Sequence, residues 1–267
     1  MGKDRFANNA GVWIHYEIEG TGPTILMRTG AGGDCRIWKD AGYEAGLTGY
    51  QTILMDQRGR GKSDRPDSIE SHSYAHHIAD IAAVLNDAGA ETAAYMGYSA
   101  GAVMGIAFGA AHPNRLKALI GMGSLPFYNF SDLPKLANPH DEVEKMVAVG
   151  GVRREYEEAS AQEGGRFPEP IENNVLEGDP RMRALDFVAG RVEKPWRGPL
   201  NVYSSLHFPV LMIAGEKEDP ERVTERSIER ISNGQLVRLP GVGHLSSFYR
   251  SDLTLPYILP FLEKHLK

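Results

Sequence analysis

The sequence predicts an α/β protein with a mostly parallel, doubly wound sheet, and three observations support this class. Short apolar runs alternate along the chain with segments of helical apolar spacing, which is typical of strands joined by crossover helices. Most of the runs are continuous, as expected of strands covered on both faces. With 267 residues, 42% of them apolar and 24% charged, the composition is ordinary for a globular protein of one large domain or two small ones.

The strands and helices of the predicted core follow from these patterns in chain order. Alternation with a period of two over residues 12–19 predicts a first strand, and the turn residues 20–23 end it. Further strands are predicted at the apolar runs 24–27, 51–55, 92–96, 116–122, 209–214 and 235–239. Helical spacing of the apolar residues predicts a helix over 74–86, with Gly89 as a stop, and a last helix from about residue 251.

One long stretch, residues 125–206, breaks the alternation of strands and helices. It holds helix-like segments at 141–161, interrupted by Gly150 and Gly151, and at 179–192, but no convincing buried strand. A structureless loop of that length is implausible in a compact domain. We therefore predict a core of residues 1–124 and 207–267 with a helical lid at 125–206. An independent helical domain is disfavoured because too few apolar residues are present for a separate core.

Composition excludes several function classes. The net charge of −6 leaves no basic stripe to neutralise phosphates, so we expect no nucleic-acid partner. No run approaches the roughly 18 apolar residues of a membrane span, and the first nine residues lack a signal-like apolar stretch. Cys35 is the only cysteine, which fits a reducing compartment, and a cytoplasmic protein is expected. The adjacent His76 and His77 point apart on a helix, so no metal site is expected there. We expect no other cofactor either.

The segment Gly97-Tyr98-Ser99-Ala100-Gly101 joins a predicted strand to a helical pattern over 103–108. A strand, a sharp turn and a helix push a serine hydroxyl out of the sheet, and small neighbours let the two backbones pass closely. Ser99 is therefore the candidate nucleophile. The alternative is a glycine-rich packing turn with an idle serine.

A serine hydroxyl needs a base within hydrogen-bonding reach, and the base needs an acid. His244, in a glycine-rich turn directly after the last predicted strand, is the candidate base. Three carboxylates follow the preceding strand, namely Glu216, Glu218 and Asp219. Glu216 follows the strand too closely to reach back comfortably, and the residues alone leave Glu218 and Asp219 open.

Three separated motifs carry a resemblance to a known family. They are Asp-Gln-Arg-Gly-Arg-Gly-Lys-Ser at 56–63, Gly-Tyr-Ser-Ala-Gly at 97–101 and Gly-Val-Gly-His at 241–244. With them the chain resembles α/β-hydrolase fold enzymes of the lipase, esterase and lactonase type, and the order of serine, acid and histidine agrees. Within the family pattern the spacing favours Glu218 as the acid, whereas an Asp-Pro pairing points to Asp219.

The resemblance also implies an oxyanion hole made of two backbone N–H groups, those of Ala31 and Ala100. Such donors contribute roughly 3–4 kcal/mol each to transition-state stabilisation. The family commonly has His-Gly before the first donor, whereas this chain has Thr29 and Gly30. The glycines still permit the tight loop, so this departure affects local hydrogen bonding and leaves the mechanism intact.

The resemblance implies a serine hydrolase that cleaves a small carboxylic ester or lactone through an acyl-enzyme. Its substrate pocket would be lined by Trp38, Leu125, Phe127 and Tyr128, each of which fits a core position equally well. Hydrolysis of a carbon–carbon bond in a diketone, or perhydrolysis, would use the same residues. An epoxide hydrolase is disfavoured because those relatives carry an aspartate at the position of Ser99. A receptor that keeps the fold but turns over poorly is an alternative of another class, and the oligomeric state is not indicated.

Overall fold

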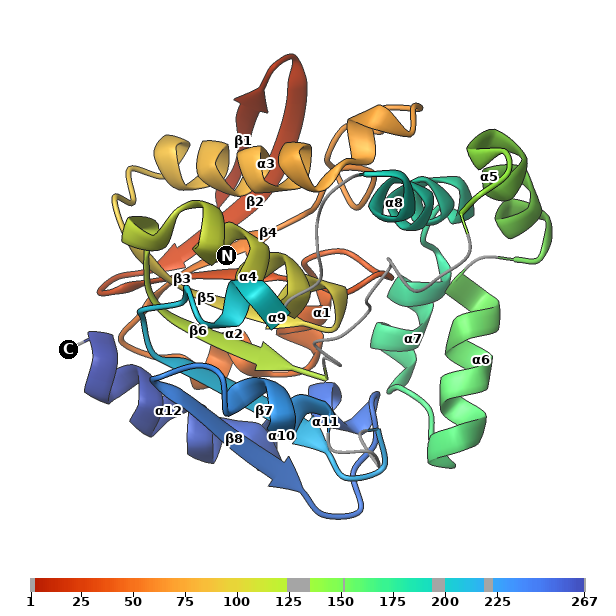
Figure 1. The fold of residues 1–267 in the computed structure, drawn as a ribbon. Coiled ribbons are helices and arrows are strands. Elements are labelled where there is room, and N and C mark those ends of the chain that lie inside the picture. The colour runs from red at the N-terminus through yellow and green to blue at the C-terminus, as the bar shows by residue number, and fades with distance from the viewer. Residues whose placement is uncertain (1–2, 124–134, 151, 194–199, 219–222, 267) are drawn as a thin grey trace.

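The structure is a computed structural model that describes residues 3–123, 135–150, 152–193, 200–218 and 223–266 (Figure 1). Within these ranges eight strands form one sheet, in the order β1-β2-β4-β3-β5-β6-β7-β8. The strands are β1 (Lys3–Asn9), β2 (Val12–Gly20), β3 (Thr24–Arg28), β4 (Gln51–Met55), β5 (Ala93–Tyr98), β6 (Leu116–Met122), β7 (Val210–Gly215) and β8 (Gly234–Leu239). From β4 to β8 all neighbours pair in parallel, and β2 pairs antiparallel with both β1 and β4. The predicted α/β class with a mostly parallel sheet is therefore confirmed.

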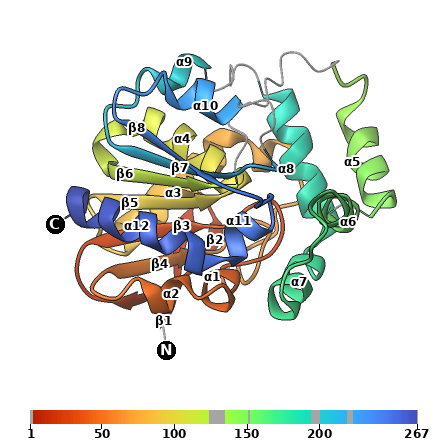
Figure 2. The same cartoon turned by 90° about the horizontal axis from the view of Figure 1, so that it is seen from below.

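Helices cover both faces of the sheet (Figure 2). One face carries α1 (Ile37–Asp40), α2 (Tyr43–Gly46), α11 (Ser246–Tyr249) and α12 (Ser251–Leu266). The other carries α3 (Tyr74–Asp87), α4 (Ala100–Ala111), α9 (Leu200–Tyr203) and α10 (Val223–Ile228). Neighbouring residues of a strand point to opposite faces, so in β5 Tyr95 packs in one core and Met96 in the other. This double burial explains why the central strands read as continuous apolar runs.

The first strand was not anticipated by the sequence pattern. β1 is charged, and it lies at the edge of the sheet, paired only with β2 among the described strands. An edge strand needs little apolar surface: Ala7 is buried, whereas Phe6 is 43% exposed. The apolar periodicity that reveals the inner strands is consequently absent here.

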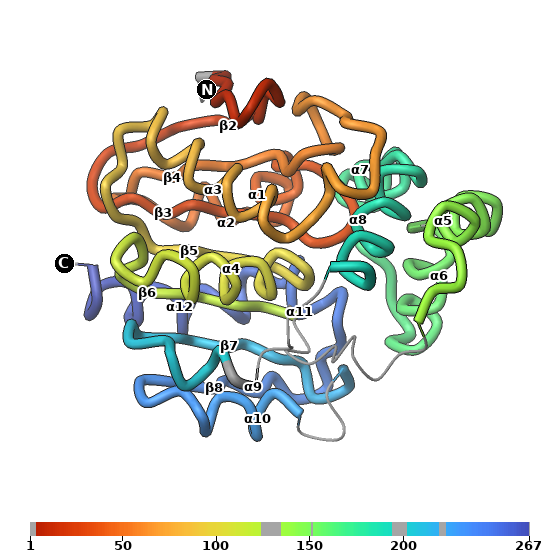
Figure 3. Tube along the Cα trace, turned by 45° about the horizontal axis from the view of Figure 1, so that its top comes forward, coloured from red at the N-terminus to blue at the C-terminus, as the bar shows by residue number. Residues whose placement is uncertain are grey.

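Four helices between β6 and β7 lie together at one side of the sheet, and we call them the cap helices (Figures 1 and 3). They are α5 (Pro139–Ala148), α6 (Val152–Glu163), α7 (Glu169–Leu176) and α8 (Pro180–Val192). The break after α5 falls at Gly150, whose φ of +89° favours glycine, and Asp179 caps α8 by accepting a hydrogen bond from the Arg181 N–H. α9, although inside the stretch predicted as a lid, packs on α4.

The cap helices share their apolar core with the rest of the molecule. Tyr156, Phe167 and Ile171 belong to the same buried cluster as Trp38 and Phe248, on the face of the sheet that α1 and α11 cover. A smaller cluster joins α5 and α8 to Ile69. That these helices act as a lid stays a prediction. None of the helices in the described ranges is long and apolar enough to cross a membrane.

A buried ion pair anchors the loop that follows β4. Arg58 donates from Nε and Nη2 to the two carboxylate oxygens of Asp80 in α3, both at 2.7 Å, and the side chains are 1% and 0% exposed. Asn9 donates to the same carboxylate at 2.7 Å. The pair therefore ties the loop to α3 and to the end of β1.

Asp80→Asn is expected to lower the free energy of unfolding by about 3–5 kcal/mol, because it leaves a guanidinium buried without a counter-ion. Urea unfolding followed by circular dichroism measures the change. Glu158→Gln is the matched control, since it removes the partner of Arg154 in an ion pair whose side chains are exposed. The control is expected to leave the unfolding midpoint unchanged. Equal shifts in the two variants would contradict the proposed anchoring role.

Candidate active site

Ser99 lies at a sharp turn between β5 and α4 and has φ of 53° and ψ of −122°. A non-glycine residue with positive φ stores roughly 1–3 kcal/mol of strain, so the surroundings must hold it. Its N–H donates to the Met122 carbonyl at 2.8 Å. An added Cβ at Gly97 or Gly101 would lie 2.6 or 2.4 Å from backbone atoms of the neighbouring segments. The turn therefore requires glycine on both sides of the serine.

His244 brings together side chains from three loops at the carboxyl ends of β5, β7 and β8. Its Nε2 lies 3.1 Å from the Ser99 Oγ, and its Nδ1 lies 2.7 Å from the Glu218 Oε2. A carboxylate at Nδ1 favours the tautomer with the proton on that nitrogen. The Nε2 lone pair is then free to accept the hydroxyl proton of Ser99.

The backbone of His244 is also held in place. Its carbonyl accepts hydrogen bonds from the Tyr98 hydroxyl at 3.1 Å and from the Ser247 hydroxyl at 2.8 Å. The rings of Tyr98 and His244 lie 5.1 Å apart with 30° between their planes. Burial raises the pKa of Tyr98 well above its usual value, so the phenol stays neutral and remains a donor.

Glu218 is the carboxylate that the structure places against His244. Its side chain is 4% exposed, and its second oxygen accepts the Gly215 N–H, so both oxygens have partners. Glu216 instead accepts the Gly241 N–H at 3.0 Å and braces the turn before His244. Asp219, the other candidate acid, lies outside the described residues.

The loop expected to supply an oxyanion donor packs directly on Ser99. A Cβ added at Gly30 would lie 3.0 Å from the Ser99 Cβ. Gln57 Nε2 donates to the Gly30 carbonyl at 3.3 Å. Because C=O and N–H point in opposite directions across a trans peptide, this bond directs the Ala31 N–H away from Gln57. Ala100 is the first residue of α4, where an N–H has no acceptor within its own helix.

Of the four predicted pocket residues, Trp38 is the one that lies within the described residues. Trp38 is fully buried and packs edge-on against Tyr43 at 5.3 Å and Phe248 at 5.1 Å. It has no exposed surface in the described structure, so its placement favours the core role. Leu125, Phe127 and Tyr128 lie outside the described residues.

A buried polar cluster between core and cap was not recognised in the sequence. Asp186 in α8 accepts hydrogen bonds from Arg60 Nη2 at 2.9 Å, His72 Nδ1 at 2.6 Å and His77 Nε2 at 3.2 Å. Burial opposes the charge of Asp186, but Arg60 and the two histidines hold its pKa well below the usual value. Arg60 also donates to the Ala31 carbonyl at 3.1 Å. The cluster thus ties α8 to the loop beside Ser99.

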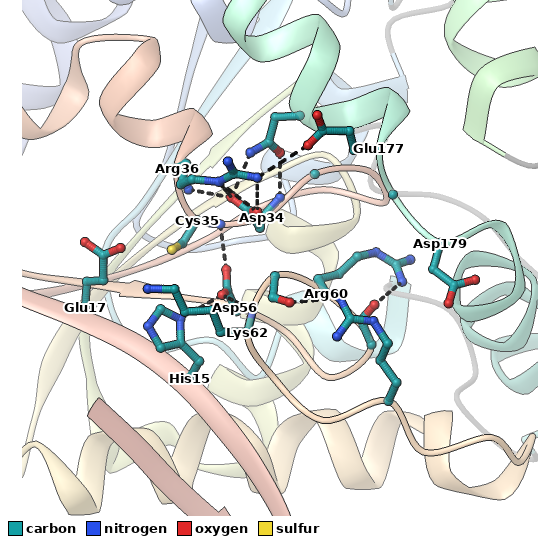
Figure 4. A pocket seen from close by; sticks show the side chains of 16 residues that line it. His15, Glu17, Asp34, Cys35, Arg36, Asp56, Arg60, Lys62, Glu177 and Asp179 are labelled. Atoms are coloured by element: carbon teal, nitrogen blue, oxygen red, sulfur yellow. Dashed lines mark hydrogen bonds and ion pairs between the residues drawn. The ribbon is translucent and has the colours of Figure 1, made fainter. Parts of the chain in front are cut away.

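A separate cavity of about 470 Å³ lies behind that loop, and neither Ser99 nor His244 lines it (Figure 4). On the wall of this cavity, the side-chain atoms of His15, Cys35 and Asp56 that could bind a metal ion lie within 4.8 Å of one another. The Asp56 carboxylate already accepts from His15 Nδ1 at 2.7 Å and from the backbone N–H groups of Cys35 and Lys62 at 2.7 and 2.9 Å.

Burial raises the pKa of the Cys35 thiol, which keeps it protonated and a weak metal ligand. The atoms of His15 and Asp56 that could bind a metal ion therefore already form hydrogen bonds within the fold. The same holds for His72, His77 and Asp186, whose polar atoms bind one another. These observations favour a structural role for both clusters over a metal site.

Comparisons with known proteins agree with this architecture. The chain is 30% identical over 115 residues to epoxide hydrolase 3 of Siraitia grosvenorii, which covers 43% of this chain and 36% of that protein. It is 23% identical over 271 residues to 2-(acetamidomethylene)succinate hydrolase of Mesorhizobium japonicum, covering 94% and 92%. This chain spans only 42% of the length of a putative carbamate hydrolase of Azorhizobium caulinodans and only 36% of the length of the epoxide hydrolase.

Among solved structures, a thermophilic esterase of Thermogutta terrifontis superposes with a TM-score of 0.78 at 22% identity, covering 99% of this chain and 100% of that one. At this identity the likeness describes the fold alone. The family model of the alpha/beta hydrolase fold matches residues 23–169, which is more than half of the sequence. The chain therefore belongs to the α/β-hydrolase fold family.

Proposed function

We propose that this protein is a serine hydrolase that cleaves a small carboxylic ester or lactone through an acyl-enzyme. The observation that carries the proposal is the hydrogen-bonded series from Ser99 Oγ through His244 to Glu218, with separations of 3.1 and 2.7 Å. Sequence similarity to hydrolases, among them 2-(acetamidomethylene)succinate hydrolase, supports a hydrolytic reaction.

In the proposed reaction His244 Nε2 takes the hydroxyl proton as Ser99 Oγ attacks the substrate carbonyl. Glu218 stabilises the resulting imidazolium, and the N–H groups of Ala31 and Ala100 bind the oxyanion. The imidazolium then protonates the alkoxide released when the tetrahedral intermediate collapses. From an ester the alcohol departs, whereas from a lactone the hydroxyl stays on the acyl group that is now bound to Ser99. A water molecule, deprotonated by His244, attacks the acyl carbonyl, and the protonated His244 returns its proton to Ser99 Oγ as the acid leaves.

The residue at the turn distinguishes this proposal from epoxide hydrolysis, despite partial similarity to epoxide hydrolases. By the family resemblance those enzymes have an aspartate at the position that Ser99 occupies. Attack by a serine hydroxyl forms an ester with an acyl group, which suits a carbonyl substrate. The same residues would serve carbon–carbon bond hydrolysis, in which a carbanion is protonated as it leaves, or perhydrolysis, in which hydrogen peroxide replaces water, so the substrate class requires a direct test.

The proposal is tested with wild-type protein and a substrate panel of p-nitrophenyl acetate, p-nitrophenyl butyrate, lactones, diketones and 2-(acetamidomethylene)succinate. Sustained turnover with the highest kcat/KM for an ester or lactone is the expected result. A fluorophosphonate is expected to label Ser99, as mapped by mass spectrometry of the digested protein. A burst of nitrophenol without continued turnover would instead favour the receptor alternative, and a preference for diketones would favour carbon–carbon hydrolysis.

Gln57→Met is expected to lower kcat about tenfold, less than the hundredfold or more that removal of a whole oxyanion donor costs. Methionine keeps the shape of the buried side chain but cannot donate to the Gly30 carbonyl, so the Ala31 N–H loses its fixed direction. The measurement is kcat and KM with p-nitrophenyl butyrate. Gln51→Met makes the same change at the opposite end of β4, and it should retain wild-type kcat. Equal kcat in both variants would show that Gln57 does not position the donor.

A further inference from the structure

Glu163, the last residue of α6, reaches from the cap helices into the turn that carries His244. Its Oε2 accepts the Leu245 N–H at 2.8 Å, and its Oε1 accepts the Ser246 N–H at 2.9 Å. The Ser246 hydroxyl donates to the same Oε1. One carboxylate of the cap therefore holds three donors that directly follow His244.

Glu163 also contacts the residue that precedes His244. A Cβ added at Gly243 would lie 2.6 Å from the Glu163 Cδ, so the two residues are in close contact and a side chain at position 243 would displace the carboxylate. The Gly243 N–H donates to the Ser246 hydroxyl at 3.1 Å, and that hydroxyl is bound to Glu163 in turn. The carboxylate thus braces the chain on both sides of His244.

The two backbone donors lie at the start of α11, where N–H groups have no acceptor within the helix. A carboxylate is a strong acceptor for them because the hydrogen bonds are charge-assisted. Without Glu163, water would have to satisfy both donors, and the turn would lose these hydrogen bonds to α6. Since catalysis by a base is sensitive to displacements of about 1 Å, a looser turn would misalign the His244 Nε2.

We propose that Glu163 is a positioning residue that makes the alignment of His244 depend on the docking of α6. This inference rests on the proposed function, because it assumes that His244 is the base. Its consequence is that the cap helices contribute to the catalytic step as well as to any enclosure of substrate. A substrate that stabilises the docked position of the cap helices would thereby also keep His244 aligned for catalysis.

The test compares Glu163→Ala and Glu163→Gln with a matched control, Glu193→Gln. Glu193 follows α8 and accepts the backbone N–H groups of Tyr74 and Ala75, the latter at 3.4 Å. Like Glu163, Glu193 is a carboxylate of the cap helices that binds the start of a core helix. The helix it binds is α3, which lies on the face of the sheet opposite to α11 (Figure 2). If hydrogen bonds between a cap carboxylate and the core merely stabilise the fold, then removing those of Glu163 and removing those of Glu193 should affect kcat alike.

Glu163→Ala is expected to lower kcat for p-nitrophenyl butyrate about tenfold with KM changed less than about twofold, because misplacement of the base affects the chemical step. Glu163→Gln keeps one acceptor oxygen and should lose less. We expect the imidazole proton between His244 Nδ1 and Glu218 to give a downfield proton NMR signal, which would report the alignment of His244 without turnover. We expect this signal to broaden or vanish in Glu163→Ala and to persist in Glu193→Gln.

A wild-type kcat together with an intact downfield signal in Glu163→Ala would overturn the inference, as would equal kcat losses in Glu163→Ala and Glu193→Gln. If the signal is lost in Glu163→Ala but the wild-type protein neither turns over esters nor is labelled at Ser99, positioning of His244 is upheld and the proposed function fails. The two failures are thus distinguishable.

Discussion

Ser99→Ala is expected to lower kcat for p-nitrophenyl butyrate by about 10⁴-fold or more, since loss of the nucleophile removes the acyl-enzyme route altogether. Residual rate would come from substrate binding and the oxyanion donors alone. Alanine keeps the Cβ that packs on Gly30 and the N–H that donates to Met122, so the melting temperature should stay near the wild-type value.

The measurement is steady-state hydrolysis alongside thermal unfolding by circular dichroism. Ser205→Ala is the control, because Ser205 is an exposed serine whose hydroxyl binds only the nearby Val202 carbonyl among the described residues. The control should retain wild-type kcat and fluorophosphonate labelling at Ser99. Retained turnover in Ser99→Ala at wild-type stability would remove Ser99 from the mechanism.

The second large effect is expected for the acid. Glu218→Gln should lower kcat by roughly 10³–10⁴-fold, the size seen when a triad carboxylate becomes an amide. The amide group can donate to His244 Nδ1 and thereby favour the tautomer with the proton on Nε2. That nitrogen would then point its proton at Ser99 and could not accept the hydroxyl proton. The imidazolium formed in the reaction would also lose its counter-charge.

Asp219→Asn makes the same chemical change at the neighbouring residue and is the matched comparison. We expect its kcat to remain within about threefold of wild type, because the structure pairs His244 with Glu218 at 2.7 Å. The two variants are compared by kcat over a pH series and by thermal unfolding. A larger loss in Asp219→Asn would assign the acid role to Asp219.

The sequence was most informative where burial or backbone geometry restricts residue choice. The central strands are predictable because both faces are covered, so nearly every residue must be apolar, as β5 and β7 show. The turn at Ser99 is predictable because the neighbouring backbones approach Gly97 and Gly101 too closely for a Cβ, so glycine is required at both positions. β1 lacks such a restriction, since an edge strand is covered on one side only.

Contacts between distant segments could not be predicted from local patterns. Glu218 and Asp219 lie three and four residues beyond the end of β7, and the three-dimensional course of the turn directs Glu218 to His244. Glu163 and Asp186 read as ordinary helix residues because their partners lie 82 to 126 positions away in sequence. Their partners depend on how the cap helices dock.

The sequence by itself determined the α/β architecture and the serine turn, because apolar patterning and glycine requirements act over a few residues. Only the tertiary structure decided which carboxylate meets His244 and which cap residue braces its turn. Hydrogen bonds between loops are set by the packing of whole helices against the sheet, and that packing leaves no local signature in the chain.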